Sequence, residues 1–322
     1  MLSSLNDGLT SVPKKQAAAI KSKEQQVQQR IAASSISCTS MVVTVFGDVV
    51  SQHGGWIWLG SLINAMKPFG FSERLVRTAV YRLVQSEWLM TKKVGRCSYY
   101  CFTETAKNHY EKAARRIYHS SQQEWNGCWT LVIPVSVSEE QRDEFRKSLG
   151  WQGFNVLSNG ILAHPSPDRR SLDETLLELG LVNSVIVMSA STDDAHSTQA
   201  IRELSRERWN IDELQRSYSE FLEFYRPWHQ DASSKLPSGK DCFLMRSMLI
   251  HDFRRILLRD PNFPDAMLPH GWIGYEAHDL LHRLYRRLTD RSVSYITSNL
   301  ESVNGHLPDP RADFYHRFGG LK

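Results

Sequence analysis

The residues best suited to chemistry in this sequence lie along Ser72–Glu87, a stretch with helical periodicity. At 100° per residue, one face of this helix is apolar and the opposite face is basic and polar. The basic and polar face consists of Arg74, Arg77, Thr78, Tyr81, Arg82 and Gln85. Arginine binds guanine edges and phosphates, and hydroxyl or amide groups bind bases or phosphates. The pattern predicts a helix that enters the major groove of DNA.

The apolar face of this helix is expected to be buried, and Ser72 is expected to cap its first turn. The apolar face comprises Leu75, Val76, Ala79, Val80, Leu83 and Val84. A surface helix with a purely structural role usually mixes both charge signs on its exposed face. Here the acids, Glu73 and Glu87, lie near the ends, which favours a binding surface.

A β-hairpin is predicted next, from Trp88–Lys93 and Cys97–Thr103 around a turn that contains Gly95. Three basic residues lie at its tip: Lys92, Lys93 and Arg96. A basic tip suits phosphate or minor-groove contacts, although it can also serve only to keep a hairpin soluble. The adjacent basic helix favours the DNA-binding interpretation.

The elements before the basic helix complete the order of a winged helix-turn-helix. Met41–Val50 is an apolar run of helical length, Trp56–Leu59 is a short strand, and Ser61–Met66 is a second helix. After the hairpin, Thr103–Tyr118 is predicted to form a further helix.

The charge distribution also indicates a polyanionic partner for the front of the chain. Residues 1–37 carry a net charge of +3 and residues 38–118 carry +6, whereas the remainder carries −5. A basic front and an acidic rear fit a nucleic-acid partner, with random scatter as the alternative.

The middle of the chain predicts a small ferredoxin-like domain, and the rear predicts a helical one. Strands are expected over Trp129–Val135, Phe154–Ala163 (one long strand or a pair) and Ser184–Ser189, with helices between them. From Thr198 to about Thr289 the pattern is helical, with breaks at Pro227, in 233–239 and in 260–274.

The expected fold class is therefore α+β, and 322 residues suffice for two or three domains. The expected regions are a polar extension, a winged helix-turn-helix with a linker helix, a ferredoxin-like domain, a helical domain and a loose tail. Their bounds are 1–37, 38–118, 119–197, 198–295 and 296–322.

Composition favours a cytoplasmic protein. The sequence has no run of 18 apolar residues, and its N-terminus lacks the apolar core of a secretory signal. The five scattered cysteines form no C-x-x-C pair, as expected for free thiols in a reducing compartment.

Motifs for enzymatic chemistry are weak. His278 and His282 have the spacing of a zinc-protease pair, but Asp279 replaces the glutamate and no third ligand suggests itself. Ser238–Lys240 lacks the upstream glycine of a phosphate loop. No motif nominates a catalytic triad, so we expect no catalytic residue, no metal and no cofactor.

Several stretches form one ordered pattern from about residue 38 to 290. They are Phe46–Asp48, Trp58–Leu62, Pro68–Gly70, Leu75–Val84, Gly95–Arg96 with Ser98–Tyr100, Arg116–Tyr118, Trp125–Trp129, Trp151–Phe154, Leu249–Pro261, Leu268–Pro269 and Leu284–Arg286. In this order they resemble one family, the PaaX-type repressors of phenylacetic acid degradation in bacteria. The extension 1–37 is not part of this pattern.

The resemblance implies a homodimeric repressor that binds a palindromic operator and is released by an aryl-CoA thioester such as phenylacetyl-CoA. The middle domain of the family resembles small CRISPR-associated nucleases, which use an acidic residue at the end of the first strand. That position reads Ile133–Val135 here, without a carboxylate, so we expect no nuclease activity. An enzyme acting on aryl-CoA or nucleic acid, with the helix-turn-helix as a targeting module, is the main alternative, and a nucleoid-type binder is another.

The effector-binding residues suggested by the sequence lie near its rear. His251, Arg254 and Arg255 precede Asp260-Pro261, and Trp272 and Tyr275 follow. They could form a cationic rim for coenzyme A phosphates beside an aromatic acyl group. Capping of a helix end explains the same arginines equally well. The predicted effector-binding residues are His251, Arg254, Arg255 and Trp272.

Overall fold

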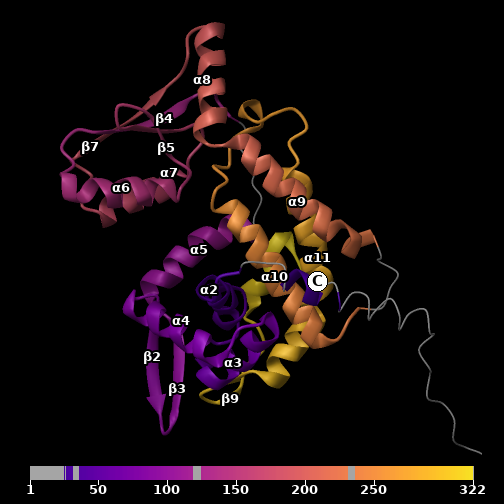
Figure 1. The fold of residues 1–322 in the computed structure, drawn as a ribbon. Coiled ribbons are helices and arrows are strands. Elements are labelled where there is room, and N and C mark those ends of the chain that lie inside the picture. Colours follow the sequence, from indigo (N-terminus) through magenta and orange to yellow (C-terminus); the bar gives the residue numbers. More distant parts are fainter. Residues whose placement is uncertain (1–24, 26, 32–35, 119–124, 231–235, 322) are drawn as a thin grey trace, which may run out of the picture. The chain divides into compact units, whose positions relative to one another are not determined.

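The computed structural model describes residues 25, 27–31, 36–118, 125–230 and 236–321. The chain mixes helices and strands (Figure 1). It divides into two compact units. Unit 1 contains the described residues within 1–106, 228–249 and 284–314, and unit 2 those within 107–227, 250–283 and 315–322. Each unit is thus assembled from three separate stretches of the chain.

Between residues 38 and 102, the described part of unit 1 contains three helices and a three-stranded antiparallel sheet in the order β1-β3-β2. These elements are α2 (Cys38–Asp48), β1 (Ile57–Trp58), α3 (Leu59–Met66), α4 (Glu73–Gln85), β2 (Leu89–Val94) and β3 (Cys97–Phe102), with 3-10 turns at Val50–Gln52 and Lys67–Phe69. The predicted order of helices and hairpin is present. The first helix begins earlier than predicted, because Ser37 caps it at Cys38.

The final residues of the chain are folded, which corrects the expectation of a loose tail. α11 (Gly274–Asn299) continues past the predicted end of the helical region, and β8 (Glu301–Ser302), β9 (Gly305–His306) and a 3-10 segment (Ala312–Gly319) follow. Leu300, Leu307 and Phe314 are buried in unit 1. Their wide spacing gives no helical or strand periodicity, so the sequence pattern did not reveal this packing.

A buried charged cluster lies inside unit 1. Nε of Arg246 lies 3.2 Å from Oδ2 of Asp48, and both side chains are fully buried. The Tyr285 hydroxyl donates to the other carboxylate oxygen of Asp48 at 2.7 Å. The guanidinium of Arg246 also lies over the rings of Tyr285 and Phe314, 5.3 and 5.7 Å from their centroids. The cluster joins α2 to α10 (Gly239–Leu257), α11 and the C-terminal segment.

Unit 2 contains a four-stranded sheet in the order β5-β6-β4-β7, with every neighbouring pair antiparallel. Its elements are β4 (Trp129–Pro134), α6 (Glu139–Gly150), β5 (Asn155–Ser158), β6 (Ile161–His164), α7 (Arg169–Glu178) and β7 (Val185–Ala190). This β-α-β-β-α-β order is that of ferredoxin-like motifs. Of the two alternatives predicted for Phe154–Ala163, one long strand or a pair, the pair is present. Its core contains Val132, Val137, Phe145, Leu149, Phe154, Leu162, Leu172, Leu176 and Leu181.

Long helices make up most of the remaining chain: α5 (Glu104–Tyr118), α8 (Ala195–Arg208), α9 (Ile211–Gln230), α10 and α11. All but α8 have residues in both units. A break was expected at Pro227, but α9 continues through it. Only three residues of the helix follow the proline, so the loss of one hydrogen bond there falls in the final turn.

The predicted extension 1–37 lies largely outside the described residues. Of its described residues, 25 and 27–31 are helical, and Val27 and Ile31 are buried rather than solvated. Within the part of the chain that the structure describes, no helix is long and apolar enough to cross a membrane. All five cysteines are free, as expected.

Candidate nucleic-acid interface and ligand pocket

α4 is held in place by its apolar face. The hydroxyl of Ser72 accepts a hydrogen bond from the Leu75 amide at 3.3 Å, which satisfies one of the free N–H groups of the first turn. Four of the residues predicted to be buried are buried: Val76, Ala79, Val80 and Leu83. α4 packs against α2 and α3, so its opposite face is exposed to solvent.

All the residues predicted to bind DNA are exposed. They are Arg74, Arg77, Thr78, Tyr81, Arg82 and Gln85 on α4, and Lys92, Lys93 and Arg96 on the hairpin. The structure places these two groups on neighbouring elements, since α4 packs on β2. We call the nine residues the basic surface.

Leu75 is an exception to the predicted burial. Its side chain is 46 % exposed, and Val84 is only half-buried. Leu75 lies in the first turn of α4, at the edge of the buried face, where the neighbouring elements do not cover it. An apolar side chain is thus exposed on the same surface as Thr78 and Arg82, three and seven residues further along the helix.

One arginine of the basic surface has an acidic partner. Nε and Nη2 of Arg77 lie 2.8 and 2.7 Å from Oε1 of Glu73, one helical turn earlier. Both side chains are more than half exposed, so the pair contributes little to stability. It extends the Arg77 side chain along the surface of α4.

The β2–β3 hairpin extends beyond α4 as a narrow ribbon (Figure 1). Lys92 is paired with Tyr99 and Lys93 with Ser98, and Gly95 occupies the turn with a φ of +59°. Because successive strand residues point to opposite faces, each face of the ribbon carries one lysine. A phosphate backbone on either side of the ribbon would therefore meet a positive charge.

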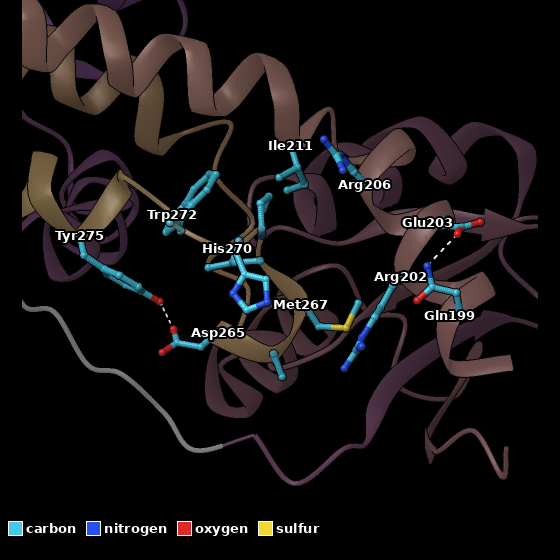
Figure 2. Close-up of a pocket in the computed structure, with 14 residues that line it drawn as sticks. Gln199, Arg202, Glu203, Arg206, Ile211, Asp265, Met267, His270, Trp272 and Tyr275 are labelled. Atoms are coloured by element: carbon cyan, nitrogen blue, oxygen red, sulfur yellow. Dashed lines mark hydrogen bonds between the residues drawn. The ribbon is translucent and has the colours of Figure 1, made fainter. Parts of the chain in front are cut away.

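A pocket of about 750 Å³ lies in unit 2, between α8 and the segment Asp265–Tyr275. Figure 2 shows Trp272 and Tyr275 toward one end and Gln199, Arg202 and Glu203 toward the other. Ile211 and Met267, both buried, add apolar surface. The pocket combines aromatic and aliphatic groups with arginines and the acids Glu203 and Asp265, a mixture of apolar and polar groups that is typical of small-molecule sites.

The predicted effector residues are only partly brought together. Trp272 lines the pocket, whereas His251, Arg254 and Arg255 are not among its lining residues. Burial, assisted by the charges of Arg254 and Arg255, lowers the pKa of His251 to about 3. His251 is therefore neutral near pH 7. Arg254 is half-buried and Arg255 exposed, both in the last turn of α10, where the helix dipole favours a cation.

The two histidines with zinc-protease spacing have structural contacts. Nε2 of His278 lies 3.1 Å from the carbonyl oxygen of Ile117. The ring of His282 stacks on Phe318 with centroids 5.1 Å apart and planes 8° from parallel. Among the described residues, no group of three or more histidine, cysteine or carboxylate side chains could hold a metal ion.

Sequence reasoning missed most of the pocket. It nominated Trp272 and Tyr275 but not Arg202, Met267 or His270. Residues 199–211 and 265–275 are separated by more than fifty positions, and neither stretch carries a ligand-binding motif. The tertiary fold alone brings them together.

Comparisons with known proteins cover nearly the whole chain. Residues 37–106 match the model of the PaaX-like protein family, residues 122–202 that of the PaaX protein central Cas2-like domain, and residues 209–298 that of the PaaX-like protein C-terminal domain. The transcriptional repressor PaaX of Escherichia coli (strain K12) is 33% identical over 298 residues, which cover 92% of this chain and 94% of that protein.

A solved structure is also similar. The uncharacterized protein Rv0674 from Mycobacterium tuberculosis aligns over 77% of this chain and 94% of its own, with a TM-score of 0.48 and 20% sequence identity.

Proposed function

This chain belongs to the PaaX-like family, and on that premise we propose that it is a transcriptional repressor that binds double-stranded DNA. The Escherichia coli relative carries the name of a transcriptional repressor. The genes that this chain controls serve the catabolism of phenylacetate, as the family resemblance implies. It acts in the bacterial cytoplasm and is a binding protein, not an enzyme.

The observation that carries this proposal is the basic surface on α4 and the β2–β3 hairpin, all of whose side chains are exposed. Residues 38–118 act as a winged helix-turn-helix domain with a linker helix. α4 is its recognition helix and the hairpin is its wing. Arg77 and Arg82 read or flank base edges in the major groove, and Lys92, Lys93 and Arg96 bind phosphates.

A homodimer supplies two recognition helices related by a two-fold axis. The operator is then an imperfect palindrome, with half-sites spaced by about one helical turn of DNA or a multiple of it. A footprint over a single half-site, together with a monomer in solution, would contradict this part of the proposal.

An aryl-CoA thioester such as phenylacetyl-CoA releases the repressor. The thioester must bind more tightly to the conformation of the protein that cannot bind DNA than to the conformation that can. A ligand with equal affinity for both conformations would not shift the equilibrium between them. A coupling of about 1–3 kcal/mol weakens operator binding by roughly 5- to 150-fold. By linkage, operator DNA weakens thioester binding by the same factor.

A selection of binding sites from genomic DNA, with and without phenylacetyl-CoA, tests the proposal. The expected result is a specific operator whose complex dissociates when micromolar thioester is added. Equal binding to all sequences would point instead to a nucleoid-type binder. Turnover of the thioester or cleavage of the DNA, measured in the same samples, would point to an enzyme with a targeting module.

A further inference from the structure

The pocket in unit 2 has one wall that is both rigid and apolar. The ring of Trp272 meets that of Tyr218 edge-on, with centroids 5.6 Å apart. The Tyr218 hydroxyl is itself held by Asp260 at 2.6 Å. Met267 and Ile211, both buried, also line the pocket with apolar surface. A flat apolar group bound there needs little rearrangement of the protein, which reduces the entropy lost on binding.

The charged side chains of the pocket differ in whether they have hydrogen-bond or ion-pair partners. The acids have partners, because Glu203 accepts a hydrogen bond from the Gln199 amide at 2.7 Å and Asp265 accepts one from the Tyr275 hydroxyl (Figure 2). Arg206 is paired with Asp212 outside the pocket at 2.7 Å. Arg202, one turn before Arg206 on α8, makes no hydrogen bond or ion pair with any residue that the structure describes.

We propose that this pocket binds an organic anion with a flat apolar group, the apolar group against Trp272 and the anionic group on Arg202. The inference rests on the proposed function and deepens it. An aryl thioester of coenzyme A has both parts, an aromatic acyl group and phosphates. The volume of about 750 Å³ is within the range of small-molecule sites. Trp272 therefore keeps the role that the sequence predicted for it. The cationic contact is assigned to Arg202 of α8, in place of Arg254 and Arg255 at the end of α10.

Calorimetry on the full chain with phenylacetyl-CoA and with free coenzyme A separates the two contacts. R202A should weaken binding of both compounds about tenfold or more, because a charge-assisted hydrogen bond to phosphate is lost. W272A should weaken phenylacetyl-CoA binding by a similar factor and leave free coenzyme A unaffected. The matched controls are R208A, on the same helix outside the pocket, and W151A, whose side chain is 54 % exposed elsewhere in unit 2. Both should bind like the wild type.

Operator binding by each variant shows that it is folded. If the wild type binds no phenylacetyl-CoA, both the effector part of the proposed function and the pocket assignment fail. If the wild type binds it and R202A and W272A bind equally well, the effector stands and the pocket assignment is overturned.

The exposure of Leu75 carries a second, independent inference. Its side chain is 46 % exposed in the first turn of α4, and N-terminal residues of recognition helices contact base edges. Leucine cannot form hydrogen bonds, and its apolar partner in the major groove is the 5-methyl group of thymine. We propose that Leu75 determines specificity by reading a thymine methyl group in each half-site. This inference also rests on the proposed DNA-binding function.

Replacement of single thymines by uracil in the selected operator tests this inference, because uracil lacks only the methyl group. The wild type should lose about fourfold in affinity at one position per half-site, as expected for one buried methyl group. L75A should bind the thymine and uracil operators equally at that position. M90A, which removes an apolar side chain of similar exposure (47 %) from β2, should discriminate like the wild type. If L75A keeps the wild-type discrimination, or the wild type shows none, the assignment to Leu75 is wrong, while wild-type operator binding separately tests the proposed function.

Discussion

Unit 1 uses arginine in two opposite ways. Arg246 is fully buried, with its charge matched by Asp48 and its guanidinium over two aromatic rings. Arg74, Arg77 and Arg82 of α4 are exposed, and the acidic partner of Arg77 is exposed as well. The buried arginine is a structural group whose removal leaves an uncompensated carboxylate. The exposed arginines contribute little to folding and remain available to a polyanion.

The largest effect should follow R246A. Removal of one partner from a buried ion pair typically costs about 3–5 kcal/mol of unfolding free energy, because Asp48 stays buried without its counter-charge. Urea denaturation followed by circular dichroism measures the loss. R170A, which breaks the exposed pair with Glu174, should change it by less than about 0.5 kcal/mol. Equal losses of unfolding free energy in R246A and R170A would mean that burial of an arginine does not determine how much it contributes to stability.

The pH dependence of His53 should be the next largest effect. Burial lowers its pKa to about 4, with Arg246 as a smaller cause in the same direction. Neutral His53 donates from Nδ1 to the carbonyl of Pro308 at 2.7 Å. The unfolded chain binds a proton near pH 6.5 that the folded chain does not bind until about pH 4. Its stability contribution is therefore complete above pH 6.5 and is lost as pH falls from 6.5 to 4, by up to about 3 kcal/mol.

H53N keeps a neutral donor and removes the titration. Denaturation of the wild type and H53N between pH 4 and 7 should give two curves of unfolding free energy against pH. Near pH 5 the slopes of these curves should differ by the equivalent of about one bound proton. Parallel curves would show that the imidazole of His53 titrates alike in the folded and unfolded chains.

The exposed arginines should affect DNA binding without affecting stability. In R77A and R82A, each lost base contact should cost about 1–3 kcal/mol of operator binding and relax specificity at one position. Fluorescence anisotropy with operator variants measures both quantities, and R142A, an exposed arginine of α6, is the control. A double mutant with wild-type specificity would remove Arg77 and Arg82 from the recognition surface.

The smallest effect should come from the wing. K93A should weaken binding to all DNA sequences alike and reduce the slope of log affinity against log salt by about one unit. K147A, an exposed lysine of α6, should leave the slope unchanged. A sequence-dependent effect of K93A would mean that the wing reads bases rather than phosphates.

Local patterns predicted α4, the hairpin and the alternation of strands and helices in unit 2. The capping residue Ser72 and the apolar spacing in α4 depend only on neighbours in the sequence, so they could be read directly. The exposure of Leu75 could not be predicted from the sequence, because helical periodicity does not show how far α2 and α3 cover the apolar face of α4. The bounds of the predicted domains remain predictions.

Features built from distant residues were not predictable in the same way. The pair between Asp48 and Arg246 and the pocket between α8 and Asp265–Tyr275 both need the tertiary fold. In the sequence, Arg246 stands among apolar helical residues, and nothing local distinguishes it from an arginine exposed to solvent. The contribution of Phe314 to the core was missed for the same reason.

The contact between Tyr285 and Asp48 spans 237 positions of the chain, and this has a consequence for biosynthesis. At a translation rate of about 5–20 residues per second, Tyr285 is made roughly 12 to 50 s after Asp48. During that interval the front of unit 1 has left the ribosome without the partners of its buried carboxylate. The nascent chain therefore carries the basic surface long before the core beneath it can close, and a chain released before residue 285 should be a target for chaperones and proteases rather than a small functional repressor.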